Sequence, residues 1–207
     1  MQKIFKLEKD FERPKNKPFD AVHIPFKMSQ ELNAGLISEI NSKILPKVVY
    51  FYANFNLLKI NQFIMSDLTT VPIMRNDMLD LIIGNEPIPF ISVPAIMIDD
   101  KFKNDAFDAT GNFIATVPHK TNYTIYGMYE SINAFNFEES VYSPNPYLPG
   151  SIYKIKKIVL KSQNGFFPRI FKINEAMGSN FIREDVKDLL EKNGIKGCVF
   201  EEVEVSG

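Results

Sequence analysis

Short apolar runs and alternating apolar and polar positions recur along most of the chain, a pattern typical of strands with a few helices between them. The segments with strand character are rich in aromatic and β-branched residues and lie at 3–7, 48–52, 88–93, 113–117, 123–129, 132–137, 152–160, 169–173 and 198–205. The order of these segments lacks the strand–helix–strand rhythm of a parallel nucleotide-binding sheet. We therefore predict an α+β fold with a mixed, mainly antiparallel sheet and a few amphipathic helices.

Helical spacing of apolar residues marks three segments. Ser29 is a plausible N-cap for a first helix, whose apolar positions run from Leu32 to Ile44 and which Pro46 ends. The other two helices carry apolar residues at i, i+4, i+7 and i+8, a spacing that places them on one buried face. These residues are Met74, Met78, Leu81 and Ile82 in the second helix and Ile182, Val186, Leu189 and Leu190 in the third.

The second and third helices resemble each other beyond their apolar positions. A shift of 182 − 74 = 108 residues also aligns Arg75, Asp77 and Asp80 with Arg183, Asp185 and Asp188. A glycine follows each helix as a natural stop, and a strand-like segment comes next. The segments 72–98 and 180–205 therefore suggest an internal duplication within a single domain, 1–207. The alternative is that burial alone imposes the same spacing on two unrelated amphipathic helices.

Two irregular segments interrupt the predicted strands. The segment 143–150 contains three prolines, which remove backbone donors and fix the chain, so we predict an exposed loop there. In 152–160 the alternation loses its phase at Lys156 and Lys157, which predicts a bulge or an edge position.

Composition and charge exclude several classes of protein. The 24 Lys and Arg residues nearly balance 25 Asp and Glu residues, so no overall field favours nucleic acid or an anionic membrane. No apolar stretch approaches the roughly 20 residues of a membrane helix. The N-terminal residues are charged, unlike a secretory signal. A single cysteine, Cys198, excludes an intramolecular disulfide and suits a reducing compartment. We expect a cytoplasmic protein with no nucleic-acid or membrane partner.

Residues that could carry chemistry are few. His23 and His119 lack neighbouring carboxylates or cysteines at ligand spacing, and the sequence around Cys198 is typical of the apolar start of a strand. The common hydrolase, protease and phosphate-binding motifs are missing. We expect a protein without catalytic activity, bound metal or cofactor.

Two groups of residues are candidates for contacting a partner. The densest carboxylate cluster comprises Asp99, Asp100, Asp105 and Asp108. Its spacing does not fit the helix–loop–helix calcium motif, and the lysines inside it would repel a cation, so a solvated loop or a contact with a basic partner is favoured. Tyr142 and Tyr147, in and beside the proline-containing segment, could anchor a partner, because tyrosine gives contact area at low entropic cost. Alternatively, both rings cover the sheet.

The chain from Thr121 onward resembles the bacterial polymorphic-toxin immunity proteins of families eleven and forty-three. The resemblance lies in the segments 122–126 and 134–140, in 170–173, and above all in the closing helix, glycine turn and strand of 182–200. The segment 72–98 resembles the same family more faintly. This resemblance implies a cytoplasmic protein that binds a cognate toxin and blocks it without chemistry of its own.

Two other functions stay open from the sequence. One is an enzyme of an unfamiliar type that uses the central carboxylates or His119, and the other is a module that binds a small ligand near the central acidic segment. The sequence does not indicate the toxin, the face that binds it, or the oligomeric state.

Overall fold

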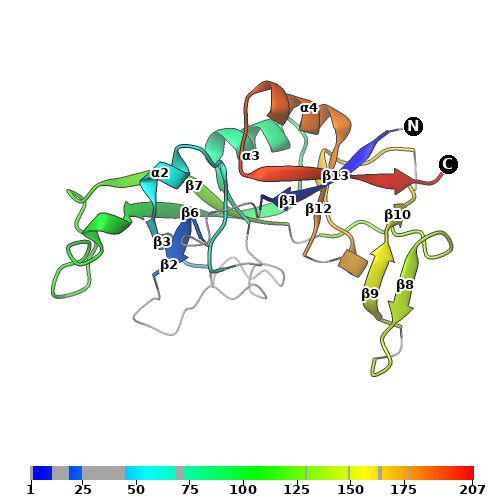
Figure 1. Cartoon of the computed structure of the whole chain (residues 1–207), viewed down its shortest axis with the longest axis horizontal. Coiled ribbons are helices and arrows are strands. Elements are labelled where there is room, and N and C mark those ends of the chain that lie inside the picture. The colour runs from blue at the N-terminus through cyan, green and yellow to red at the C-terminus, as the bar shows by residue number, and fades with distance from the viewer. Residues whose placement is uncertain are drawn as a thin grey trace.

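The computed structural model describes residues 2–10, 19–24, 45–68, 72–128, 130–148, 150–162, 165–176 and 178–207. Across these residues the chain forms a six-stranded sheet, a five-stranded sheet and a separate two-stranded hairpin. Both larger sheets lie side by side, and two short helices cover them from the same side (Figure 1). The predicted α+β class with mainly antiparallel pairing is confirmed. The helix predicted behind Ser29 lies outside the described residues.

The six-stranded sheet has the order β2-β3-β6-β7-β5-β4. Its strands are β2 (Ala21–His23), β3 (Val49–Ala53), β4 (Phe63–Ile64), β5 (Ile73–Arg75), β6 (Phe90–Asp99) and β7 (His119–Met128). Only β3 and β6 pair in parallel. The helix α2 (Phe55–Leu58) follows β3, and α3 (Asn76–Ile83) connects β5 with β6.

The five-stranded sheet has the order β10-β13-β1-β12-β11. Its strands are β1 (Ile4–Lys9), β10 (Val159–Leu160), β11 (Ile170–Phe171), β12 (Asn180–Arg183) and β13 (Cys198–Val205), and α4 (Glu184–Lys192) connects β12 with β13. The hairpin consists of β8 (Val141–Pro144) and β9 (Ile152–Lys157). Two 3₁₀ segments, η1 (Asp100–Phe102) and η2 (Asn174–Ala176), complete the described elements.

Both large sheets repeat one pairing scheme. In each, one strand pairs in parallel with a long strand (β3 with β6, β10 with β13), and in the six-stranded sheet β2 pairs with the other side of β3. The long strand pairs antiparallel with a central strand, which pairs antiparallel with the strand before the helix (β6-β7-β5, β13-β1-β12). A two-residue strand closes each sheet. The central strands come from different places in the chain, since β7 follows β6 whereas β1 is the first strand.

The residue register is repeated as well. Tyr123 of β7 lies opposite Arg75 and Ala95. Ile4 of β1 lies opposite Arg183 and Val203, which are the same two positions plus 108. Arg75 and Arg183 each precede a helix and each make a two-pronged contact with the aspartate two residues later. That aspartate lies in the first helical turn, where the helix dipole favours negative charge. An origin of this likeness by duplication stays a prediction.

The helices α3 and α4 join the sheets through one apolar cluster. This cluster contains Met78 and Ile82 of α3, Val186 and Leu190 of α4, and buried residues of strands from both sheets. The first apolar residue of each of these two predicted helices, Met74 and Ile182, lies on the strand before the helix, on β5 and β12. They are nevertheless fully buried on the expected face, because strand and helix share this cluster.

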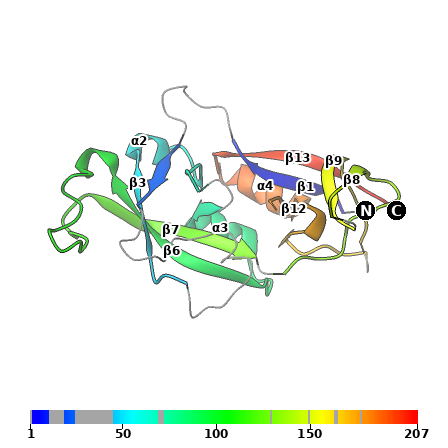
Figure 2. The same ribbon diagram turned by 90° about the horizontal axis from the view of Figure 1, so that it is seen from below.

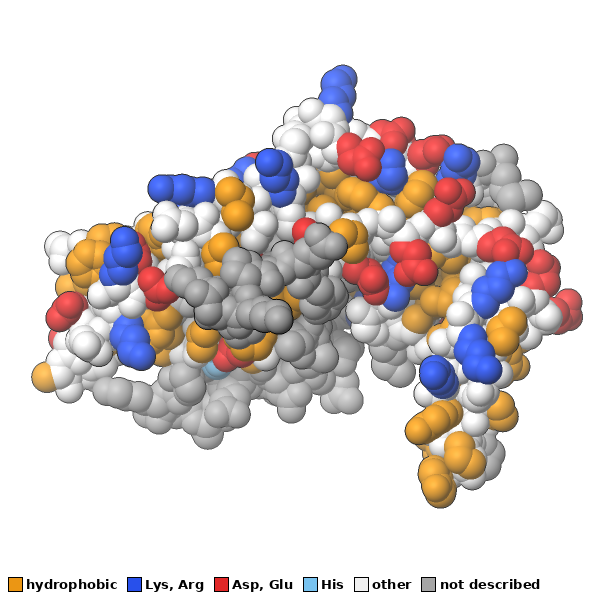
Figure 3. All heavy atoms as spheres, in the orientation of Figure 1, with side chains coloured by type: hydrophobic (Ala, Val, Ile, Leu, Met, Phe, Trp, Pro, Cys, Tyr) orange, Lys and Arg blue, Asp and Glu red, His pale blue; other side chains and the backbone are white. Residues whose placement is uncertain are grey.

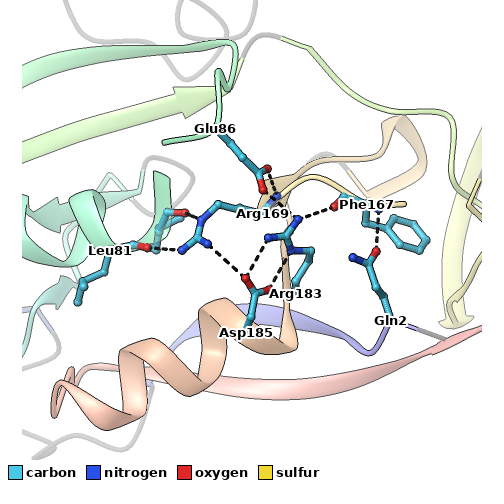
Figure 4. Close-up of polar contacts among 8 residues, drawn as sticks. Gln2, Leu81, Glu86, Phe167, Arg169, Arg183 and Asp185 are labelled. Atoms are coloured by element: carbon cyan, nitrogen blue, oxygen red, sulfur yellow. Dashed lines mark hydrogen bonds and ion pairs between the residues drawn. The ribbon is translucent and has the colours of Figure 1, made fainter. Parts of the chain in front are cut away.

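Arg169 forms a polar link between two units, the six-stranded sheet with α3 and the five-stranded sheet with α4 (Figure 4). Its Nε and one terminal nitrogen donate to the carbonyls of Ile82 and Leu81 at the end of α3, at 3.0 and 2.8 Å. The other terminal nitrogen lies 3.2 Å from Asp185 at the start of α4. Glu86 receives the Arg169 backbone N–H and an ion pair from Arg183. Two arginines and two carboxylates thus tie the end of one helix to the start of the other.

Some predicted strands are wrong. The segments 113–117 and 132–137 have only isolated bridges, at Phe113 and Phe135. Their aromatic residues pack on neighbouring rings from irregular backbone: Phe113 lies 5.3 Å from Tyr50, and Phe135 lies 4.9 Å from Phe137, between ring centroids. Aromatic enrichment therefore reflected burial in these segments and not strand pairing.

Replacing Arg169 with Met should lower the free energy of unfolding by about 2–4 kcal/mol, because Met keeps the aliphatic stem but leaves two carbonyls and Asp185 without their donor. Lys3→Met is the matched control, because Lys3 forms an ion pair with Glu184 in which both side chains are about half exposed. This substitution should lower the free energy of unfolding by no more than about 1 kcal/mol. Urea unfolding measures both. Equal, small losses would contradict the assigned role of Arg169.

Candidate partner-binding surface

The β8–β9 hairpin projects from the five-stranded sheet and ends in an ordered turn (Figure 1). The side-chain oxygen of Asn145 accepts the backbone N–H groups of Tyr147 and Leu148, at 2.9 and 3.2 Å. The Asn145 N–H donates to the carbonyl of Ser151, whose hydroxyl donates to the carbonyl of Leu148. These local bonds fix the conformation of the turn in advance of any contact.

Apolar side chains are exposed on this ordered turn and along the hairpin. Tyr147 is 90% exposed, Leu148 61% and Tyr153 69%. Figure 3 shows apolar side chains at the end of the hairpin, with basic side chains between them and the body of the protein. A domain gains nothing in its own stability from such exposure, and exposed aromatic and apolar groups surrounded by basic side chains are typical of a partner-binding surface.

The base of the hairpin is anchored in the core. Tyr142 packs edge-to-face on Phe135 and Phe137, with both centroid distances 5.8 Å. Ile152 and Ile155 are partly buried against the same cluster. Tyr142 therefore covers the core, as the alternative reading proposed, whereas Tyr147 points into solvent. The predicted loop at 143–150 begins later than expected, because Ser143 and Pro144 end β8, where an edge strand tolerates proline.

A groove of about 630 Å³ lies beside the hairpin. Its walls are β9 with the residue that follows it (152–158), residues 201–204 of β13, Glu175, Ala176 and Ser179, together with Lys6 of β1. The predicted bulge is also there, since the register with β8 shifts opposite Lys156. Two ion pairs border the groove, Lys6 with Glu8 at 2.5 Å and Lys157 with Glu204 at 2.6 Å.

The six-stranded sheet has apolar residues at positions equivalent to those that line this groove. Lys6 and Glu201 lie opposite each other on β1 and β13. The 108-residue shift relates Glu201 to Val93, and the residue opposite Val93 on β7, which takes the place of Lys6, is Ile125. Ile125 and Val93 are 1% and 2% exposed. At these two positions the six-stranded sheet is covered by apolar packing, whereas the five-stranded sheet has two charged residues that line the groove. Charged residues at positions equivalent to core positions favour a binding surface.

The acidic segment lies elsewhere. Asp99 ends β6 and accepts the N–H of Lys101, while Asp100 and Asp105 are exposed. Figures 1 and 2 both place the β6–β7 connection at the end of the molecule opposite the hairpin. The sequence-predicted contact residues are thus in two separate places. The structure does not bring the aspartates together with Tyr142 and Tyr147.

Asp108 is occupied within its own loop. One carboxylate oxygen accepts the backbone N–H groups of Thr110 and Asn112, both at 2.9 Å, and the Thr110 hydroxyl at 2.7 Å. The other oxygen accepts the Asn112 side chain. These bonds to the ionised form, led by the Thr110 hydroxyl, lower the pKa of Asp108 to about 2. The side chain therefore shapes the loop.

The two histidines and Cys198, which we expected to have no catalytic or metal-binding role, have surroundings typical of structural residues. Nδ1 of His119 lies 2.8 Å from the carbonyl of Val117, and the ring of His23 packs on Phe51. His119 begins β7. Burial raises the pKa of Cys198 to about 12, with Asp10 and Glu191 adding to the effect, so the thiolate is disfavoured. Within the described ranges, no cluster of three His, Cys, Asp or Glu residues could hold a metal ion.

Sequence reasoning missed several residues of this surface. Leu148, Tyr153 and Lys154 belong to the exposed hairpin, and Glu175 and Glu202 line the groove. A signal for the turn was present, because Asn145 followed by proline and tyrosine is a common turn signature. The groove had no such signal, since it forms from four segments that are separate in the sequence.

No protein-family model matches this chain, and no curated protein sequence matches it. Among the residues that the structure describes, no helix is long and apolar enough to cross a membrane.

The loop around Asp108 should lose order in acid. The folded pKa lies below the ordinary value of 3.8, so the stabilisation is present above about pH 4 and is lost as the pH falls through about 2. Nuclear magnetic resonance titration of the carboxyl should give that low midpoint, with the Thr110 and Asn112 amides shifting together with it. In Asp108→Asn these amides should not titrate. A midpoint near 4 would contradict the assigned bonds.

Asn145→Ala should loosen the hairpin turn, because it removes the acceptor of two backbone N–H groups. We expect the amides of Tyr147 and Leu148 to exchange at least about tenfold faster, a loss of about 1.4 kcal/mol of local protection. Asn145→Asp keeps the acceptor oxygen and should retain most of the protection. Hydrogen exchange followed residue by residue distinguishes these results, and unchanged exchange in the alanine variant would exclude the pre-formed turn.

Proposed function

We propose that this chain is a non-catalytic binding protein of the immunity type, which captures a cognate bacterial toxin in the cytoplasm with its β8–β9 hairpin. The observation that carries the proposal is the pre-formed turn that holds Tyr147 almost fully exposed. An ordered aromatic anchor loses little conformational freedom on binding and can contribute a large part of the affinity.

Charge around the anchor supports a protein partner. Lys154 and Lys156 are exposed on β9, beside the apolar turn. An apolar centre with a basic rim complements a partner surface that carries an apolar pocket within acidic residues. The resemblance of 121–207 to immunity proteins supports the same role. We do not propose an enzyme, because the residues suggested for one, Asp105, Asp108 and His119, do not line the groove.

The test is co-expression with the toxin domain encoded beside the gene. The full chain should restore growth, and the double variant Tyr147→Ala, Leu148→Ala should bind the toxin roughly 30-fold more weakly, as expected for the loss of an anchor worth about 2 kcal/mol. Ile60→Ala is the matched control, because Ile60 is an apolar residue that is 53% exposed in the turn after α2. Calorimetry of purified proteins gives the affinities.

Two results would count against the proposal in different ways. Cells that die equally with and without the chain would remove the immunity function. Full protection by the double variant, with Ile60→Ala behaving the same, would show that the hairpin end does not bind the toxin.

A further inference from the structure

The long strand β13 has an open edge. On one side it pairs with β1 along residues 198–203. On the other side it pairs with β10 only at Glu204 and Val205. Figure 2 shows β13 at the outer margin of the five-stranded sheet. Six residues of this strand therefore have no neighbouring strand on their outer side within the described part of the chain.

Two backbone hydrogen bonds fix which groups point outward. The N–H of Asp10 donates to the carbonyl of Gly197 on the β1 side, and the N–H of Ser206 donates to the carbonyl of Leu160 on the opposite side. Because backbone groups alternate between the two sides of a strand, odd-numbered residues bond to β1 and even-numbered residues face outward. The N–H and C=O groups of Cys198, Phe200 and Glu202 thus lie along the open edge, and none of them bonds to a described residue.

The negative charge along this edge favours the addition of a strand that carries positive charge. Glu204 is neutralised by Lys157 at 2.6 Å. Glu201 and Glu202 are exposed and have no ion pair with any described residue. Charges on an edge strand oppose pairing with another edge of the same sign, so two copies of this edge would repel each other. A strand with lysine or arginine beside these glutamates would be attracted instead.

The groove gives the side chains of such a strand a place to lie. Residues 201–204 of β13 line it consecutively. Successive side chains of a strand point to opposite faces, so a groove that touches four residues in a row reaches the edge of the strand, while Lys6 of β1 shows that it also continues over the face that Lys6 and Glu201 share. An added strand would extend the sheet at this edge and place alternate side chains in the groove, beside Glu201.

We propose that β13 binds an extended, basic segment of the partner protein by strand addition, with main-chain bonds to Phe200 and Glu202 and lysine or arginine side chains beside Glu201 and Glu202. This mode gives affinity through the backbone and specificity through the side chains. The inference rests on the proposed protein-binding function and names the part of the partner that is recognised.

The test uses a ten-residue peptide in which pairs of lysines alternate with pairs of valines, so that lysines lie on both faces of the added strand. The control peptide has glutamates in place of the lysines, and the readout is hydrogen exchange of the ¹⁵N-labelled chain. The basic peptide should slow exchange of the Phe200 and Glu202 amides at least tenfold, and the acidic peptide should leave them unchanged. No protection by the basic peptide, or equal protection by both, would overturn the proposal.

Variants separate the backbone and charge contributions. Glu202→Pro removes an outward N–H, which an edge strand tolerates, and should abolish capture of the basic peptide. Glu202→Lys should weaken capture at least fivefold, whereas Glu130→Lys, the same change at an exposed glutamate that has no ion pair with any described residue, should not. The amide spectrum of β1 checks folding in each variant. Capture that survives both changes at Glu202 would contradict the proposed edge.

These outcomes are independent of the growth assay. Loss of peptide capture with hairpin-dependent protection intact would reject strand addition alone. Peptide capture without any protection from the toxin would reject the immunity function and leave the edge site standing.

Discussion

The insertion of β1 between β12 and β13 is the pairing on which the rest of the structure depends. Its even-numbered residues bond to β13 and its odd-numbered residues face β12. This pairing completes a sheet whose other strands all come from the last quarter of the chain. It also places Lys6 in the groove and directs the free backbone groups of β13 outward. The proposed binding surface therefore depends on contacts between the two ends of the sequence.

Comparison of the two units separates residues that maintain the fold from residues available for binding. The arginine and aspartate at the start of each helix, and the apolar cluster around α3 and α4, are common to both units. The densest polar network, around Arg169 and Arg183, uses its donors internally and so serves the junction. The units differ at Lys6 and Glu201, which occupy positions where the first unit has buried apolar residues. We propose that a partner binds at the positions where the two units differ.

Local patterns allowed much of the fold to be predicted. The strand 198–205 and the second and third helices were found because each carries a regular apolar period bounded by glycine. Tyr147 was identified because a proline-containing segment with an aromatic residue favours an exposed loop. The pairing of β1 with the C-terminal strands could not be predicted, since strand pairing across nearly 200 residues leaves no local trace. The groove could not be predicted for the same reason, and the bonds that the Asp108 carboxylate makes within its own loop were not anticipated.

The central claim is that the binding surface comprises the hairpin end and the open edge of β13, and that it excludes the acidic segment at the other end of the molecule. Hydrogen–deuterium exchange of the chain with and without the purified toxin that we propose as its partner tests this claim most directly. Protection should appear at 145–148 and at the outward amides of β13, while residues 99–108 exchange at unchanged rates. Protection confined to 99–108, with the hairpin and β13 unaffected, would contradict the account.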